Sequence, residues 1–171
     1  MSKGTRCPME EARQIAETVK AELLKLGIET AISGSILSGS KPDAGDVDLV
    51  ISAENYQKLS DIAHVVEKIM PLEYTKGSKK NPSRISCGYF NDMRIEFYVA
   101  KPNAFGAMML FATGSGMFNV RMGRKAQTLG YRLSQYGLFD TKTNQLLTGD
   151  EDEIFKMLGM DWKEPIDREE G

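Results

Sequence analysis

The sequence predicts an α+β protein in which a strand-rich first half, residues 1–102, is followed by a smaller and mostly helical second half, residues 103–171. Before residue 102, segments with apolar residues at helical spacing alternate with β-branched, strand-like segments. After the Lys101-Pro102 pair, the apolar residues recur mainly at helical spacing. The chain of 171 residues is long enough to bury a core in one domain or in two small units that share a cleft.

The elements of the first half follow from apolar spacing and from residues that begin or end helices and turns. Pro8 suits the first position of a helix, and Gly27 suits its end. Pro71 ends a second helix, and Asn91-Asp92 is a hairpin signal between two strands. In chain order we expect a helix over 8–26, strands over 28–33 and 47–52, a helix over 54–70, and strands over 84–90 and 93–99.

The second half is predicted in the same way. A helix over 103–111 is followed by a helix over 115–129, which Ser115 caps and Gly130 closes. Short strands near 131–139 and 145–147 and a last helix near 150–158 complete the chain.

Charge is unevenly distributed along the chain. The formal net charge of −2 and the pI near 5.6 argue, taken alone, against a nucleic-acid binder. Residues 97–139, however, carry five basic residues and no acidic one, whereas residues 140–171 carry four basic and ten acidic residues. The acid-free stretch is either a solvated face or a positive surface that meets a polyanion.

Several classes of protein are not favoured. Cys7 and Cys87 are too few for a disulfide scaffold or for a metal site of their own. The chain has no run of about 18 apolar residues, and acidic residues precede any apolar segment near the N-terminus. We therefore expect no membrane span and no targeting signal, and a location in the cytoplasm or elsewhere inside a cell.

Three carboxylates carry the chemistry. Asp46 and Asp48 flank Val47 at the start of a predicted strand, so their side chains point to the same face. Carboxylates held side by side repel each other unless a cation lies between them, and Mg²⁺ takes oxygen ligands of this kind. Glu96, a polar residue inside an apolar strand, is the candidate third ligand. The alternatives are an Asp-containing turn before a strand and, for Glu96, an exposed edge strand.

A Gly- and Ser-rich segment precedes the Asp pair. Glycines allow a close backbone approach, and amides and hydroxyls donate to phosphate oxygens. A phosphate-binding loop that ends in a metal-binding pair is an arrangement suited to phosphoryl transfer. The residues concerned are Gly34, Ser35, Ser38, Gly39, Ser40 and Gly45.

The motifs resemble a known family. Gly34-Ser35 followed by Gly45-Asp46-Val47-Asp48 resembles the signature of the polymerase-beta nucleotidyltransferase superfamily. The second half resembles family X DNA polymerases over residues 111–115, 117–119, 135–137 and 162–165. The resemblance runs from about residue 10 to 170 and is strongest over 94–140. It implies a mixed-sheet palm over 1–102 and a subdomain over 103–171 that binds the nucleotide and the template pair, without an N-terminal lyase domain, as in small viral enzymes.

The resemblance also implies a function and a set of roles. The protein would be a DNA-directed DNA polymerase that adds deoxynucleotides from dNTP to a primer 3′-hydroxyl, on a primer–template or a gapped duplex, in short gap filling during DNA repair. Asp46 and Asp48 would bind two Mg²⁺ ions, or Mn²⁺, and Glu96 would complete the catalytic metal site. The nucleotide contacts implied are Gly34, Ser35, Ser38, Gly45, Phe111, Ala112, Gly114 and Asn119. Arg94 would lie beside the primer terminus, Tyr136 is a candidate DNA contact in family register, and we expect a monomer.

Basic residues supply further candidates for DNA binding. Arg124 and Lys125 lie on the predicted helix of the acid-free stretch and are expected to contact the DNA backbone. Lys76 and Lys79 lie in a second basic segment, which is either a solvated turn or a contact with the template backbone.

Three departures from the family pattern leave alternatives open. The family has Asp where this chain has Glu96, and one extra methylene moves a carboxylate by about 1.5 Å. Ser38 stands where the family often has an Arg, for which Lys41 could substitute. Ala112 replaces an aromatic residue at the sugar pocket. The alternatives are a template-independent nucleotidyltransferase of the same superfamily and a nucleic-acid binding protein with an impaired active site.

Overall fold

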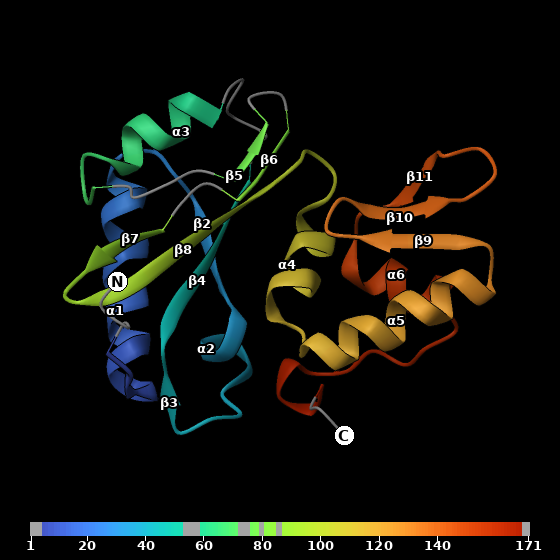
Figure 1. Ribbon diagram of the computed structural model, residues 1–171, viewed down its shortest axis with the longest axis horizontal. Coiled ribbons are helices and arrows are strands. Elements are labelled where there is room, and N and C mark those ends of the chain that lie inside the picture. The colour runs from blue at the N-terminus through green and yellow to red at the C-terminus, as the bar shows by residue number, and fades with distance from the viewer. Residues whose placement is uncertain (1–4, 53–58, 72–75, 79–80, 85–86, 169–171) are drawn as a thin grey trace.

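The two halves of the sequence form two parts that lie side by side (Figure 1). The computed structural model describes residues 5–52, 59–71, 76–78, 81–84 and 87–168. Within that part of the chain, no helix combines the length and the apolar character needed to cross a bilayer.

A four-stranded mixed sheet is the centre of the first half. Its strands are ordered β2 (Thr30–Ser33), β4 (Asp46–Ser52), β8 (Met93–Ala100) and β7 (Cys87–Phe90). The central pair, β4 and β8, is parallel, and both outer pairs are antiparallel. Its register sets Asp46 opposite Arg94 and Asp48 opposite Glu96.

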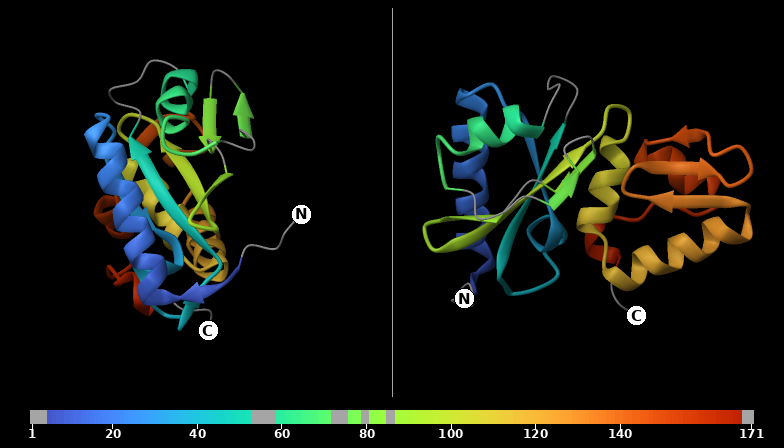
Figure 2. Two further views of the ribbon diagram at one scale, coloured as in Figure 1. Left: turned by 90° about the vertical axis from the view of Figure 1, so that its left-hand side faces the viewer. Right: turned by 45° about the horizontal axis from the view of Figure 1, so that its top comes forward.

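The two faces of the sheet have different partners, because alternate side chains of a strand point to opposite faces. Val47, Leu49, Ile51 and their neighbours on β8 pack under α1 (Met9–Lys25) and α3 (Leu59–Val66). On the other face, Val50 packs with Ala100 and with Met108 of the second half. Figure 2 shows α1 and α3 on one side of the sheet and α4 on the other. The carboxylates therefore lie on the face toward the second half.

The second half packs three helices against a three-stranded antiparallel sheet. Its elements are α4 (Phe105–Thr113), α5 (Gly116–Thr128), β9 (Tyr131–Ser134), β10 (Gly137–Asp140), β11 (Leu146–Thr148), α6 (Glu151–Met157) and the 3₁₀ turn η1 (Pro165–Asp167). Phe118, Met122 and Leu138 belong to its separate core. Each half thus has a core of its own, and the division into domains at residue 102 stays a prediction.

Most of the predicted elements are present. Ser115 caps α5 by accepting a hydrogen bond from the Phe118 amide at 3.0 Å. Asn91 and Asp92 both have positive φ, as the tight turn between β7 and β8 requires. The helix expected over 54–70 ends at Val66, and residues 54–58 lie outside the described residues.

The segment expected to be an irregular loop, 34–45, contains regular structure. Its first residues form the short helix α2 (Gly34–Ser38), whose Ile36 carbonyl accepts a hydrogen bond from Arg13 Nη2 at 2.9 Å. Its last residues form β3 (Asp43–Ala44), which pairs with β1 (Cys7–Pro8). The basic segment after residue 75 is also regular, with β5 (Lys76–Ser78) and β6 (Asn81–Arg84) paired antiparallel. The pair of β1 and β3 joins segments more than 30 residues apart, and α2 is supported by Arg13 on another helix, so local sequence shows neither.

Candidate functional site

Three carboxylates converge on the face of the sheet that looks toward the second half. Ligand oxygens of Asp46, Asp48 and Glu96 all lie within 4.8 Å of one another. The two Asp side chains are half-buried, and Glu96 is only 5% exposed. Anions this close repel one another strongly when they are partly removed from water. A set of carboxylate oxygens fits a hard divalent cation such as Mg²⁺ or Mn²⁺, so the residues present suit the metal that the sequence predicts.

Glu96 is held by two neighbours on its own strand. Arg94 Nη2 lies 3.0 Å from Glu96 Oε1, and the hydroxyl of Tyr98 donates a hydrogen bond to Glu96 Oε2 at 3.0 Å. The three residues alternate along β8, so they share one face. The positive charge of Arg94 offsets part of the charge of the cluster.

Gly34 makes room for one of these carboxylates. Its φ of +64° lies in the left-handed region, which side chains rarely adopt. A Cβ placed there would lie 2.2 Å from Asp48 Oδ2. The preceding residue, Ser33, donates a hydrogen bond to the Asp48 backbone carbonyl at 3.1 Å. The start of α2 is therefore fitted closely against β4.

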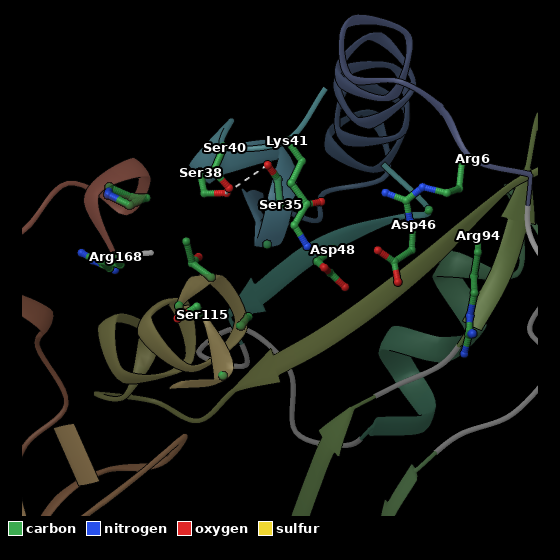
Figure 3. A pocket seen from close by; sticks show the side chains of 17 residues that line it. Arg6, Ser35, Ser38, Ser40, Lys41, Asp46, Asp48, Arg94, Ser115 and Arg168 are labelled. Carbon is green, nitrogen blue, oxygen red and sulfur yellow. Dashed lines mark hydrogen bonds between the residues drawn. The ribbon is translucent and has the colours of Figure 1, made fainter. Parts of the chain in front are cut away.

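A polar cleft of about 600 Å³ lies between the two halves and ends at Asp46 and Asp48 (Figure 3). From the first half, α2 and the residues after it line one wall, and from the second half, residues 112–116 line the other. Residues that the sequence singled out line this cleft, among them Gly34, Ser35, Ser38, Ser40, Gly45, Asp46, Asp48, Arg94, Ala112 and Gly114. Lys41, the proposed substitute for an Arg, lines it as well.

Arg6 is a cleft residue that the sequence analysis missed. It lines the cleft and forms an ion pair with Asp43, whose pKa is lowered by the hydrogen bond from the guanidinium. The pairing of β1 with β3 brings Arg6 there, and a Cβ on Gly45 would lie 3.2 Å from Arg6 Nη1. These residues are far apart in the sequence, so no local signal points to Arg6.

Arg168 is a second cleft residue that was missed, and its contacts are structural. It is 2% exposed, pairs with Glu151 and donates from Nε to the Lys163 carbonyl at 2.9 Å. Its guanidinium also lies 5.4 Å from the ring centroid of Phe155. Burial raises the pKa of Glu151, and the charge of Arg168 opposes that rise. These contacts hold the C-terminal segment, whose turn η1 contacts α2 beside the cleft.

Three predicted residues line a second hollow. Phe111, Asn119 and Tyr136 lie around a less polar space of about 390 Å³ in the second half. Asn119 Nδ2 donates to the Phe111 carbonyl at 3.0 Å, and a Cβ on Gly114 would lie 2.2 Å from Asn119 Oδ1. Lys101 Nζ lies 4.4 Å from the centroid of the Tyr136 ring. Phe111 and Gly114 flank the cleft-lining residues 112 and 113, so the two hollows are neighbours.

The candidate DNA contacts lie on different elements of the structure. Arg124 and Lys125 are exposed on α5, in the acid-free stretch. Lys76 lies on β5. Lys79 lies outside the described residues. The roles assigned to all of these residues stay predictions.

Sequence comparisons show similarity between this chain and known DNA polymerases. Residues 108–169 match the family model of the DNA polymerase beta thumb. The chain is 26% identical to DNA polymerase lambda of Rattus norvegicus over 190 residues, a match that covers 96% of this chain and 33% of that protein. It is 25% identical to DNA polymerase lambda of Arabidopsis thaliana over 195 residues, covering 96% and 36%. The chain thus spans about a third of the length of these curated relatives.

Solved structures give the same result for the fold. Leishmania infantum polymerase beta, described as a ternary P/T complex, superposes with a TM-score of 0.79 at 22% identity, covering 98% of this chain and 78% of that one. The ternary gap complex of the same protein gives a TM-score of 0.77 at 22% identity, covering 97% and 71%. Together the comparisons confirm the resemblance inferred from the sequence: the chain is similar to family X DNA polymerases and has the fold of polymerase beta.

The close approach of Gly34 to Asp48 can be tested by mutation. We expect Gly34→Ala to lower the free energy of unfolding by about 1–3 kcal/mol more than Gly39→Ala does, because overpacking costs that much. Gly39 is a matched control: its φ of +63° imposes the same backbone strain, and its Cβ would meet no atom nearer than 3.9 Å. Urea denaturation of the two variants measures the difference, and equal losses would show that the contact with Asp48 is not tight.

Proposed function

We propose that the protein is a DNA-directed DNA polymerase that adds deoxynucleotides from dNTP to a primer 3′-hydroxyl and fills short gaps in DNA. The observation that carries this proposal is the convergence of Asp46, Asp48 and Glu96, of which the two Asp residues line a polar cleft between the two halves. The similarity to DNA polymerase lambda over 96% of the chain supports the same reading.

The proposed reaction is an in-line phosphoryl transfer. The primer 3′-oxygen forms a bond to the α-phosphorus, the bond from that phosphorus to the pyrophosphate oxygen breaks, and the hydroxyl proton is lost to a base. Two divalent cations, when bound, would activate the attacking oxygen and offset the charge of the leaving pyrophosphate. In this chain Asp46 and Asp48 would hold both cations, and Glu96 would complete the catalytic metal site. Arg94 would lie beside the primer terminus.

The triphosphate would lie along α2 in this proposal. The hydroxyls of Ser35 and Ser38 and the backbone around Gly34 and Gly45 line the cleft, where donors suit phosphate oxygens. Ser38 carries no charge, so a cation has to come from elsewhere. Arg6 and Lys41 line the same wall, and Figure 3 shows the Lys41 side chain running toward Asp48. These two residues would together replace the guanidinium expected at position 38.

The thumb would supply the contacts to the nascent base pair and to DNA. Phe111, Ala112, Gly114 and Asn119 would surround the sugar and base, beside the hollow that Tyr136 also lines. Arg124 and Lys125, exposed on α5, would contact the DNA backbone. We also propose that the protein acts as a monomer inside a cell.

The metal-ligand role of Asp46 has a direct test. We expect Asp46→Asn to reduce primer extension on a one-nucleotide-gapped duplex by at least about 100-fold in Mg²⁺ and in Mn²⁺, because misplacing reacting groups by about 1 Å already costs that much. Single-turnover extension with radiolabelled primer measures the rate. Asp92→Asn is the matched control, since Asp92 is exposed in the β7–β8 turn and lies outside the cluster; it should retain the wild-type rate.

The same assay separates the competing functions. Extension that follows the templating base supports the polymerase. Untemplated addition of nucleotides would favour a template-independent nucleotidyltransferase. Absence of extension by the wild-type protein in either metal ion, with DNA binding retained, would contradict the polymerase and favour a nucleic-acid binding protein.

The proposed DNA face on α5 predicts the salt dependence of binding. Each neutralised phosphate releases counterions, so the logarithm of the affinity falls with the logarithm of salt with a slope of about −0.9 per contact. We expect Lys125→Gln to reduce the magnitude of that slope by about 0.9, and Lys68→Gln, an exposed residue behind the sheet, to leave it unchanged. Fluorescence anisotropy with gapped DNA between 50 and about 200 mM salt measures both slopes. A wild-type affinity independent of salt would rule out this face.

A further inference from the structure

One side chain of the carboxylate cluster, Glu96, is longer than the Asp that the family has at this position. Glu96 lies directly opposite Asp48 in the parallel pair, at the position where an Asp would complete the metal site. The extra methylene extends its carboxylate by about 1.5 Å and adds a rotatable bond. Because this side chain is longer and has one more rotatable bond, neighbouring residues have to fix its conformation if its oxygens are to ligate the same ion as the two Asp carboxylates.

Tyr98 is placed to fix it. Its hydroxyl donates to Glu96 Oε2 at 3.0 Å, while Arg94 engages the other oxygen, Oε1, at 3.0 Å. A carboxylate offers about four lone-pair positions, so both oxygens keep acceptor capacity for a cation after these contacts are made. The two contacts hold the carboxylate from both sides, within 4.8 Å of the ligand atoms of Asp46 and Asp48.

The ring of Tyr98 is itself held in place. It packs against the small apolar cluster of Val50, Ala100 and Met108, which joins the sheet to α4 of the second half. The phenol therefore has little freedom, and its hydroxyl is a fixed donor at the end of a rigid ring. Phe at this position would keep the ring and its apolar packing and would remove the hydroxyl that donates to Glu96.

We infer that Tyr98 is a positioning residue of the metal site: its hydroxyl holds the longer Glu96 carboxylate in the conformation that ligates the cation. This inference rests on the proposed function, since it assigns the cation to the same three carboxylates. Tyr98 acts only through Glu96 and does not touch the cation or the substrate. The longer ligand, Glu96, and the hydrogen-bond donor that fixes it, Tyr98, are thus two residues apart on the same strand.

Direct binding of Mn²⁺ to the full chain tests the inference without relying on activity. We expect Tyr98→Phe to weaken Mn²⁺ binding by at least about tenfold, the usual cost of removing a hydrogen bond that orients a metal ligand. Electron paramagnetic resonance of free Mn²⁺ measures the affinity. Tyr131→Phe, which removes a hydroxyl from a half-buried ring in the thumb, should bind as the wild type does.

A double-mutant cycle separates positioning from a general structural effect. In a Glu96→Asp background the carboxylate is drawn back by about 1.5 Å, out of reach of the Tyr98 hydroxyl. There Tyr98→Phe should change the Mn²⁺ affinity by less than about twofold, because the two residues no longer interact.

Each result has a distinct meaning. Wild-type affinity in Tyr98→Phe, or equal losses in both backgrounds, would overturn the positioning role while leaving the metal site intact. Failure of the wild-type chain to bind Mn²⁺ would overturn the proposed function and this inference with it. An unchanged thermal transition of Tyr98→Phe, together with weaker Mn²⁺ binding, would support the inference, since it excludes misfolding as the cause.

Discussion

The parallel pairing of β4 with β8 is the constraint on which the site depends. It places Asp48 opposite Glu96 and Asp46 opposite Arg94, so three carboxylates and one guanidinium share a face of the sheet. A shift of one residue in either strand would turn that strand's polar residues into the apolar core under α1 and α3. The buried odd-numbered residues of both strands therefore fix the register, and the register in turn fixes the site.

The partial burial of the three carboxylates strengthens the repulsion between them. Three carboxylates within 4.8 Å are unfavourable unless cations are near them, and the fold supplies several. Arg94 pairs with Glu96, while Arg6 and Lys41 line the adjoining cleft. The net charge of −2 hides this arrangement, because the acidic residues lie mainly at the site and after residue 139, while residues 97–139 carry basic residues alone. Local charge is therefore more informative than the pI.

Sequence patterns predicted the elements that depend on interactions between residues close together in the chain. The helix from Met9, the β7–β8 turn and the Ser115 cap follow from apolar spacing, turn residues and capping. The carboxylate site could be predicted because the two-residue repeat of a strand fixes which side chains share a face. The position of Arg6 could not, since it depends on the pairing of β1 with a strand more than 30 residues away. The helical turn α2 was missed because its support comes from Arg13, on another helix.

We propose that Asp46, Asp48 and Glu96 together bind two cations beside the cleft. The most direct measurement is anomalous diffraction from crystals of the full chain grown with gapped DNA, Mn²⁺ and a non-hydrolysable dNTP. We expect two anomalous peaks beside Asp46 and Asp48, one of them also at coordination distance from Glu96. Peaks that lie away from these carboxylates, or no peak in a complex that holds the nucleotide in the cleft, would contradict it.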